Sequence, residues 1–424
     1  MANITAVILA AGRGTRMKSE KPKVMHEILG KPMIWYVVDS VKKAGVKKLV
    51  LVAGFGSESV RAFFEGVGIK TVLQKKLLGS ADAVKTAGSQ IRGTGDCLVV
   101  YGDTPLVSSA TLKRLIEKHA DSGSSLTLLT AVLKNPSGYG RIIRNTEGRI
   151  MKIAEEDEAK TCKKEIKEIN VGTCIIKSAD LFDALKKIGC DNPKKEYYLT
   201  DAVKILSDQG KRVESVAIDD LDEMIGVNSR VELAKASSCI KARVLDALMA
   251  EGVTVQDPAT TTVYPDAGIG RDSVIYPNTI IESGVKIGSH CHIGPFARIR
   301  PGTEIADNAE IGNFVELVRT KIGESTRVKH HTYLGDASVG KNVNIGAGTI
   351  TANYDGKNKN KTVIGDGSFI GVGTIFIAPV RVGKKAMTGA GTVILKGHNI
   401  KDGATAVGVP ARILERRRTE RRKS

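Results

Sequence analysis

Aromatic residues are scarce in this chain, its cysteines form no sequence pair, and it has no long apolar run. Phe, Trp and Tyr make up 4% of the 424 residues. The six cysteines are scattered without a CxxC motif, which excludes a zinc site or disulfide framework of the usual spacing and is typical of a reducing cytoplasm. No apolar run approaches the length of a membrane-spanning helix, and no signal peptide precedes the first strand. The sequence therefore predicts a cytoplasmic protein that does not enter a membrane.

The charge is strongly positive but uneven. The chain carries a formal net charge of +18 at pH 7, much of it in an arginine-rich tail, residues 414–424. An excess of positive charge indicates nucleic acid or small anionic ligands as partners. Because no nucleic-acid motif and no alternation of basic and aromatic residues is present, phosphorylated small molecules are favoured over nucleic acid. We expect the tail to be a solvated, disordered end.

The second half of the chain repeats a six-residue phrase. A fixed period of six is typical of a parallel β-helix, in which each aliphatic residue points into one continuous core. Two one-residue slips, after Leu317 and after Leu334, and an insertion at 351–361 interrupt the period. The repeated positions are Ile269, Ile275, Ile281, Ile287, Ile293, Ile299, Ile305, Ile311, Leu317, Ile322, Val328, Leu334, Val339, Ile345, Ile364, Ile370, Phe376, Val382, Thr388, Ile394 and Ile400.

The first half reads as an α/β domain. Apolar runs at 4–9, 48–53 and 97–101 alternate with helical patterns, which predicts a parallel sheet with helices on its faces. Ligands of such sheets bind beyond the carboxyl ends of the strands. Gly12, Gly14 and Asp103 all follow strands directly, so we expect the binding site there.

The glycine-rich turn after the first strand is neither of the two common phosphate motifs. Residues 12–17 lack the third glycine of G-x-G-x-x-G, and no GK[ST] follows. The small residues still allow backbone N–H groups to approach a phosphate, and Arg13, Arg16, Lys21 and Lys23 lie nearby. This combination indicates a nucleoside triphosphate, although a glycine-rich turn alone can be only a tight turn.

Residues 9–17 and 21–26 (LAAGRGTRM and KPKVMH) resemble the motif of sugar-nucleotide pyrophosphorylases, and 101–106 (YGDTPL) resembles their metal-binding turn. From this turn to the hexads, the chain resembles the bifunctional N-acetylglucosamine-1-phosphate uridylyltransferase/glucosamine-1-phosphate N-acetyltransferases. The resemblance implies an α/β Rossmann-like nucleotidyltransferase domain followed by a left-handed parallel β-helix of hexapeptide repeats. We expect the former at 1–228, a helical linker opened by a capping box at 229–251, the β-helix at 252–413 and the basic tail at 414–424.

The resemblance also implies the residues of uridylyl transfer, in which a sugar-1-phosphate attacks UTP and releases pyrophosphate. Asp103 and Asn228 would hold Mg²⁺, which takes oxygen ligands, and Arg16 and Lys23 would act in catalysis by spreading negative charge. The expected residues for UTP or UDP-N-acetylglucosamine are Leu9, Ala10, Ala11, Gly12, Lys23, Gln74, Gly79, Ser80, Tyr101, Gly102, Asp103, Gly140, Glu155, Asn170 and Asn228.

A second site is implied where the hexad period breaks. His330 takes the place of the general base that removes a proton from the amine attacking acetyl-CoA. The expected glucosamine-1-phosphate residues are Arg300, Tyr333, Asn344 and Lys359. The positions along which acetyl-CoA would pass are Ala347, Asn353, Tyr354 and Ala390. Members of the family associate through the β-helix as trimers, so a homotrimer is expected.

Three positions depart from the family pattern. Val318 stands where the family has a lysine, Val372 where it has a serine and Gly408 where it has an arginine. The change at Val318 leaves open a uridylyltransferase whose β-helix mainly assembles trimers or carries altered acyl transfer. Two further alternatives also stay open: another sugar-1-phosphate nucleotidyltransferase, and a non-enzymatic scaffold with a nucleotide-binding domain.

Overall fold

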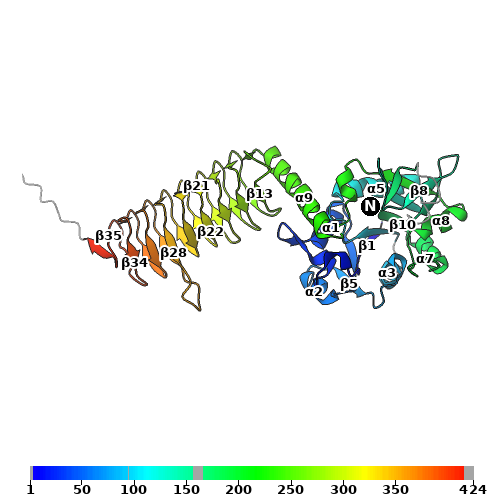
Figure 1. Ribbon diagram of the computed structural model, residues 1–424, viewed down its shortest axis with the longest axis horizontal. Helices are drawn as coiled ribbons and strands as arrows, with labels where there is room; N and C mark the ends of the chain where they lie inside the picture. Colours follow the sequence, from blue (N-terminus) through cyan, green and yellow to red (C-terminus); the bar gives the residue numbers. More distant parts are fainter. Residues whose placement is uncertain (1–2, 94, 156–165, 415–424) are drawn as a thin grey trace, which may run out of the picture. The chain divides into compact units, whose positions relative to one another are not determined.

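The computed structural model describes residues 3–93, 95–155 and 166–414. The chain divides into two compact units, Met1–Cys239 and Ile240–Ser424, each drawn in Figure 1. Cys162 and the basic tail, apart from Leu414, lie outside the described residues. No helix in the described ranges is both long enough and apolar enough to span a membrane.

A nine-stranded sheet forms the first unit, and its strands bear out the three apolar runs read from the sequence. Its main path runs in the order β11 (Val213–Ala217), β7 (Leu126–Val132), β10 (Glu168–Lys177), β6 (Asp96–Tyr101), β1 (Ile4–Ala10), β4 (Lys48–Ala53) and β5 (Lys70–Leu73), with β8 (Arg141–Arg144) and β9 (Ile150–Ala154) off this path. Strand β1 pairs in parallel with β4 and β6. The expectation of a parallel sheet is wrong for β10, which runs antiparallel between β6 and β7.

Helices cover both faces of this sheet. Successive residues of β1 point to opposite faces, so Ile8 packs in one buried cluster and Val7 in another. The cluster around Ile8 includes residues of α1 (Met33–Lys43), α2 (Ser57–Phe63) and α5 (Ser109–Ser122), and the other includes residues of α3 (Ser80–Thr86), α4 (Gly88–Ile91), α7 (Ser178–Lys187) and α8 (Asp201–Asp208). Short elements complete the unit: η1 (Thr15–Met17), η2 (Lys23–Met25), η3 (Leu221–Met224), β2 (Glu27–Ile28) and β3 (Lys31–Pro32).

The helix α9 (Arg230–Ala250) begins after a capping box, as predicted. The backbone N–H of Glu232 donates to Ser229 Oγ at 3.3 Å, and the N–H of Ser229 donates back to Glu232 Oε2 at 2.7 Å. These two bonds satisfy groups that a helix start leaves free. Further along the helix, Leu245 and Leu248 pack into the core of the second unit.

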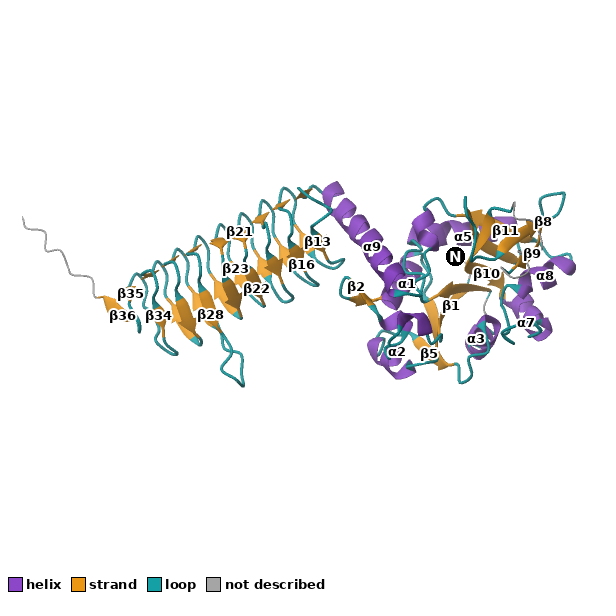
Figure 2. Ribbon diagram, viewed as in Figure 1, coloured by secondary structure: helices purple, strands orange, loops and turns teal. Residues whose placement is uncertain are grey.

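The second unit is the predicted β-helix, with three sheets as its faces (Figure 2). The first face consists of β12 (Thr254–Val255), β15 (Val274–Ile275), β18 (His292–Ile293), β21 (Glu310–Asn313), β24 (Arg327–His330), β27 (Asn344–Ile345), β30 (Phe369–Ile370), β33 (Met387–Thr388), β35 (Thr405–Val407) and β36 (Arg412–Leu414). The second face consists of β13 (Thr262–Val263), β16 (Ile280–Ile281), β19 (Arg298–Ile299), β22 (Glu316–Val318), β25 (Tyr333–Gly335), β28 (Ile350–Ala352), β31 (Ile375–Ile377) and β34 (Val393–Ile394). The third face consists of β14 (Gly268–Ile269), β17 (Lys286–Ile287), β20 (Glu304–Ile305), β23 (Lys321–Ile322), β26 (Ala337–Val339), β29 (Thr362–Ile364) and β32 (Val380–Val382).

The register of the coils follows the hexads. Ile275 pairs with Ile293 and Ile293 with Ile311, so one coil takes three hexads. At the first slip, Ile311 pairs with Val328, one residue earlier than the regular coil would place it. The hexad side chains form one continuous buried cluster from Val255 to Ala406. The hexad period predicted this parallel β-helix, and the family resemblance alone implied that it is left-handed.

Candidate functional site

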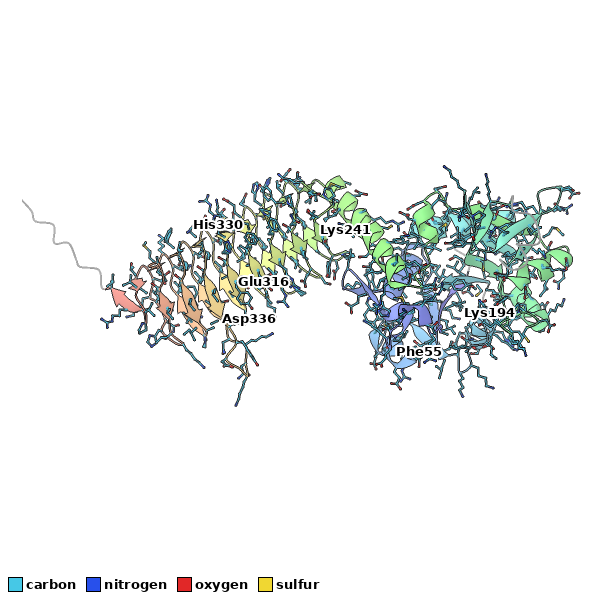
Figure 3. The ribbon with its side chains drawn as sticks, in the orientation of Figure 1. Phe55, Lys194, Lys241, Glu316, His330 and Asp336 are labelled. Atoms are coloured by element: carbon cyan, nitrogen blue, oxygen red, sulfur yellow. The ribbon has the colours of Figure 1, made fainter. Side chains whose placement is uncertain are left out.

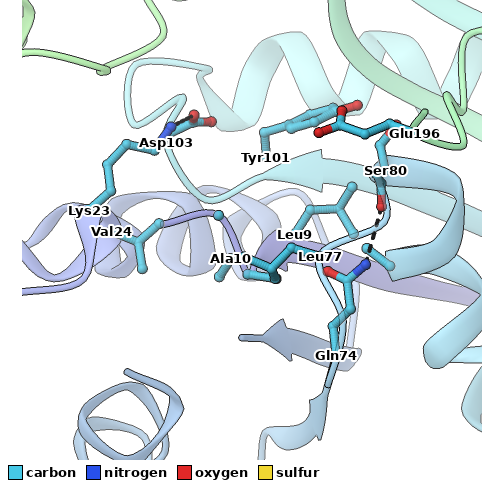
Figure 4. Close-up of a pocket in the computed structure, with 14 residues that line it drawn as sticks. Leu9, Ala10, Lys23, Val24, Gln74, Leu77, Ser80, Tyr101, Asp103 and Glu196 are labelled. Atoms are coloured by element: carbon cyan, nitrogen blue, oxygen red, sulfur yellow. Dashed lines mark hydrogen bonds and ion pairs between the residues drawn. The ribbon is translucent and has the colours of Figure 1, made fainter. Parts of the chain in front are cut away.

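A cavity of about 240 Å³ opens at the carboxyl ends of β1 and β6, where the sequence placed the nucleotide (Figure 4). Most of the predicted nucleotide residues line it, namely Leu9, Ala10, Ala11, Gly12, Lys23, Gln74, Gly79, Ser80, Tyr101 and Asp103. Four further lining residues were absent from that set: Val24, Leu77, Ala83 and Glu196. Val24 lies within the motif at 21–26, whereas none of the motifs described above contains Leu77, Ala83 or Glu196.

The two glycines of the turn have different roles. A Cβ added at Gly12 would meet nothing within 4 Å, so the fold leaves the space in front of its backbone open. Gly14 has a φ of +66°, and a Cβ there would lie 2.6 Å from the Cβ of Lys23. A glycine is therefore required at position 14, both for its positive φ and because Lys23 lies against it. At position 12 no atom of the chain requires a glycine, and the space in front of the backbone is open to a ligand.

Gly12→Ala is expected to lower nucleotide turnover about tenfold or more, because the methyl group would occupy the space open to a phosphate. The free energy of unfolding should change by less than about 0.5 kcal/mol, since the methyl group meets no atom of the chain. Steady-state kinetics and thermal unfolding measure the two effects. Gly189→Ala is the matched control, because the nearest atom to its added Cβ is Asp191 Oδ2 at 3.9 Å. Unchanged turnover in Gly12→Ala would contradict a ligand at this turn.

Lys23 joins the two predicted metal ligands. Its ammonium contacts Asp103 Oδ2 and donates to Asn228 Oδ1 at 2.9 Å. All three side chains are half-buried. The oxygens of Asp103 and Asn228 thus converge on one positive charge, although 125 residues separate them in the sequence.

The start of α9 holds Asn228 in place. The backbone N–H of Asn228 donates to Glu232 Oε2 at 2.8 Å, and the Ser229 hydroxyl donates to the same oxygen at 3.0 Å. Burial alone would raise the pKa of Glu232, but these hydrogen bonds outweigh it and lower the pKa. The charge of Arg16 lowers it further. Arg16 is exposed on η1 and does not line the cavity.

Two loops form the far wall of the cavity. Ala81 N donates to Tyr197 O at 2.9 Å, and Tyr197 N donates to Leu78 O at 2.8 Å. Gly79 has a φ of +107°, and a Cβ there would meet Tyr197 O at 2.5 Å. The segments 78–81 and 196–199 are therefore locked together, which places Gly79 and Ser80 at the cavity.

Three of the residues predicted for UTP or UDP-N-acetylglucosamine, Gly140, Glu155 and Asn170, form a second group near Tyr101. Asn170 N donates to Gly140 O at 2.9 Å, and Glu155 accepts a hydrogen bond from the Thr200 hydroxyl at 2.9 Å. The register of β10 against β7 shifts between Asn170 and Cys174, and such bulges re-aim side chains. Gly140, Glu155 and Asn170 do not line the 240 Å³ cavity, and neither does Gly102, whose N–H donates to Leu9 O at 2.9 Å.

His330 lies at the end of β24, at the corner between the first and second faces of the β-helix. It is exposed, and its register partner is Asn313 one coil earlier. His330 Nδ1 lies 2.8 Å from Asn313 Oδ1. Because an amide oxygen only accepts, Nδ1 carries the proton in this pair, and Nε2 is left as the basic nitrogen. Asn313 was not among the residues predicted from the sequence.

The corner that carries His330 continues through the following coils. The register of β24 with β27 places Ala347 beside His330. Gly373 N donates to Ala347 O at 2.7 Å, and Gly391 N donates to Val372 O at 2.7 Å. Ala347, Val372 and Ala390 therefore occupy the same corner of successive coils, about 4.8 Å apart. This ridge of small or short side chains, residues 347, 372 and 390, leads away from His330.

Two of the four predicted sugar-phosphate residues, Arg300 after β19 and Tyr333 on β25, belong to the second face, which also carries Glu316, labelled in Figure 3. Arg300 Nη1 donates to Glu316 Oε1 at 2.9 Å in the next coil, and Glu316 pairs in register with Tyr333. Asn344 lies instead on β27 of the first face. Lys359 lies on the insertion, where its backbone pairs with that of Tyr354 in an isolated antiparallel β-bridge.

Tyr333 and Asn353 meet above Gly335. A Cβ added at Gly335 would lie 2.5 Å from the Tyr333 hydroxyl and 2.7 Å from Asn353 Nδ2. Asn353 Nδ2 also donates to Asp336 Oδ2 at 2.5 Å. Arg319 lowers the pKa of Asp336, to which its guanidinium donates twice, at 2.6 and 2.8 Å.

Gly335→Ala is expected to lower the acetyl transfer that the family resemblance implies about tenfold or more, because the methyl group must displace Tyr333 or Asn353. It should also destabilise the β-helix by about 1–3 kcal/mol. Uridylyl transfer, measured on the same preparation, should not change. Gly268→Ala is the control, since a Cβ there meets nothing within 4 Å. If Gly335→Ala kept full acetyl transfer, the assignment of Tyr333 and Asn353 to the site would be wrong.

The three departures from the family pattern lie in different surroundings. Val318 is 3% exposed and pairs with Gly335, but it is Leu317, and not Val318, that belongs to the inward-pointing core cluster. The neighbouring Arg319 supplies a cation already paired with Asp336. Val372 is 57% exposed on the ridge of small residues. Gly408 has a φ of +94° in the turn between β35 and β36, a backbone conformation that an arginine would adopt only with strain.

Family models match both units of the chain. The MobA-like NTP transferase domain matches residues 6–188. The bacterial transferase hexapeptide (six repeats) matches residues 266–300 and 284–319, and the hexapeptide repeat of succinyl-transferase matches residues 361–396.

Relatives of similar length cover both units together. The Bifunctional protein GlmU of Carboxydothermus hydrogenoformans is 44% identical over 92% of this chain and 94% of its own length. That of Pelotomaculum thermopropionicum is 45% identical over 89% of this chain and 90% of its own length. That of Geobacillus thermodenitrificans is 41% identical, with 95% of each chain covered.

Proposed function

This chain belongs to the family of the bifunctional GlmU proteins, and from this premise we propose how its residues divide the family's two reactions. It is an enzyme of UDP-N-acetylglucosamine synthesis, with uridylyltransferase and glucosamine-1-phosphate N-acetyltransferase activities. The observation that carries the division of labour is the pair of separate polar clusters: Lys23, Asp103 and Asn228 at the sheet edge, and His330 with Asn313 on the β-helix.

The first unit performs uridylyl transfer. A phosphate oxygen of N-acetylglucosamine-1-phosphate attacks the α-phosphorus of UTP, a new P–O bond forms, and the bond to pyrophosphate breaks. The open backbone at Gly12 receives the triphosphate, and the Lys23 ammonium neutralises charge that grows on it. Arg16, exposed on η1, adds a second positive charge at the entrance. Glu155 and Asn170 orient the sugar beside Tyr101.

Asp103 and Asn228 are suited to Mg²⁺. Their oxygens already converge on the Lys23 ammonium, so both can face one cation, and Mg²⁺ commonly takes one or two protein oxygens together with substrate phosphates. When bound there, Mg²⁺ would supply charge stabilisation to the phosphates. Lys23 would then turn its ammonium from these oxygens to the triphosphate, a movement its flexible stem allows.

The second unit performs acetyl transfer. The amine of glucosamine-1-phosphate attacks the thioester carbon of acetyl-CoA, the C–N bond forms, and the C–S bond breaks. His330 Nε2 takes the proton of the amine and can return it to the departing sulfur, while Asn313 holds the ring by Nδ1. Arg300, Tyr333, Asn344 and Lys359 hold the sugar phosphate. Ala347, Asn353, Tyr354 and Ala390 border the path of acetyl-CoA along the ridge.

A homotrimer through the β-helix fits its surface. Large apolar side chains are exposed on successive coils, among them Phe296, Phe314, Phe369 and Met387. The rings of Phe296 and Phe314 stack at 5.2 Å, and Phe314 stacks on His331 at 5.0 Å. Such a patch indicates a protein interface.

The buried free thiols of Cys97, Cys174 and Cys291 support a cytoplasmic setting.

The test measures both activities on one preparation. UTP and N-acetylglucosamine-1-phosphate should release pyrophosphate only with Mg²⁺, and acetyl-CoA with glucosamine-1-phosphate should release free thiol. The substrates of one reaction should not inhibit the other, because the two reactions use separate units. Pyrophosphate release without thiol release would restrict the chain to uridylyl transfer and overturn the assignment of the β-helix.

A further inference from the structure

The carboxamide of Gln74 is held by two acceptors. Gln74 is 5% exposed and lines the nucleotide cavity. Its Nε2 donates to Asp82 Oδ2 at 2.8 Å and to Gly79 O at 3.2 Å. A carboxylate and a carbonyl can only accept hydrogen bonds, so both protons of the amide group are engaged by partners of one kind.

These two partners set which end of the amide faces the cavity. If the carboxamide turned over, Gln74 Oε1 would face the oxygens of Asp82 and Gly79, and three acceptors would be left without protons. The amide nitrogen is therefore held toward α3. In Figure 4 the oxygen of Gln74 lies on the opposite side, toward Ala10. The cavity consequently presents a hydrogen-bond acceptor at this position and no donor.

We propose that Asp82 is a positioning residue that sets base selectivity in uridylyl transfer by fixing the orientation of Gln74. The inference rests on the proposed function of the first unit. Uracil carries an N–H at N3, which can donate to Gln74 Oε1. Cytosine has an unprotonated nitrogen at the same place, and two acceptors facing each other cost both their hydrogen bonds.

Asp82 acts through Gln74 and not on the nucleotide directly. It lies in the first turn of α3 and is half-buried, but it does not line the cavity, whereas its neighbours Ser80 and Ala83 do. The α3 backbone holds Asp82, and Ala81 is tied to Tyr197 by its N–H at 2.9 Å. Asp82 is thus fixed on a rigid element behind the residue that faces the base.

Asp82→Asn tests the proposal, because an asparagine amide can donate to a turned Gln74. The ratio of kcat/KM for UTP over CTP should fall about tenfold, the value of one net hydrogen bond. It should not invert, since Gly79 O still favours the original orientation. The kcat with UTP should stay within about twofold, because Asp82 touches no reacting group. Asp180→Asn, the same change in the first turn of α7 and away from the cavity, should leave the ratio unchanged.

A double variant separates positioning from a general structural effect. In a Gln74→Ala background, adding Asp82→Asn should not change the UTP/CTP ratio further, since the residue through which Asp82 acts is gone. A further change there, or an unchanged ratio in Asp82→Asn alone, would overturn the proposal. If thermal unfolding shows that Asp82→Asn is not folded, Asp82→Ala replaces it, and the same fall in the UTP/CTP ratio is expected. A parent enzyme with no UTP-dependent pyrophosphate release would instead overturn the proposed function itself.

Discussion

Replacing His330 by alanine is expected to lower acetyl transfer by about 10²- to 10⁴-fold, the usual contribution of a general base. The loss should fall mainly on kcat, because the imidazole removes a proton during the attack and does little to hold the substrates. Uridylyl transfer should not change, since His330 belongs to the β-helix alone. Thiol release from acetyl-CoA and pyrophosphate release from UTP, measured on the same preparation, check both halves of the expectation.

The neighbouring histidine provides the control. His331 is also exposed, but its ring stacks on Phe314 and it has a φ of +42°. His331→Asn keeps a residue that tolerates this backbone and should retain acetyl transfer within about threefold. If His330→Ala and His331→Asn lost activity equally, the corner would be sensitive to any change, and His330 would not be the base.

Asp103→Asn is expected to lower uridylyl transfer by about 10³-fold, because several kcal/mol of charge stabilisation depend on this carboxylate. The substitution keeps the shape of the side chain and removes only its charge. The Mg²⁺ concentration that gives half-maximal rate should rise, which a Mg²⁺ titration of pyrophosphate release would show. Acetyl transfer should be unaffected.

Asp39→Asn is the matched control for this second variant. Asp39 forms a partly exposed ion pair with Lys43 on α1 at 2.7 Å, and ion pairs near the surface contribute little. Its loss should leave both activities and the Mg²⁺ dependence unchanged. An unaltered Mg²⁺ requirement in Asp103→Asn would show that the metal is held elsewhere, and the assignment of Asp103 and Asn228 would have to be abandoned.

Local sequence patterns were enough to predict much of the architecture. The hexads predicted the β-helix and the buried residue of nearly every turn, because a period of six can bury one side only if the coils stack. The strand ending at Ala10 and the turn at Gly12 were equally clear, since a buried parallel strand must be apolar throughout. The capping box at Ser229 correctly predicted the start of α9.

Features that depend on contacts between residues far apart in the sequence could not be predicted. Where β10 pairs with β6, Cys174, Ile175 and Ile176 are all buried and apolar. Such a run does not distinguish an antiparallel strand from a parallel one, because a segment buried on both faces is apolar in either direction. The need for a glycine at position 14 could not be predicted either. It follows from the structure, in which Lys23 occupies the space that a Cβ at position 14 would need. Val318 stands where the family has a cation, and the structure shows it as a buried residue outside the inward-pointing core cluster.

By itself, the sequence determined the two folds, the order of the units and the chemical types of residue available to each site. Only the tertiary structure decided which of these residues meet. Lys23 and Asn228 are 205 residues apart, yet their side chains share a hydrogen bond. Asn313 reaches His330 because the coils stack, and Asp82 reaches Gln74 because the loop at 75–79 turns back and brings the start of α3 to Gln74. Local periodicity records which side of an element is buried, whereas hydrogen bonds between elements depend on how the whole chain packs.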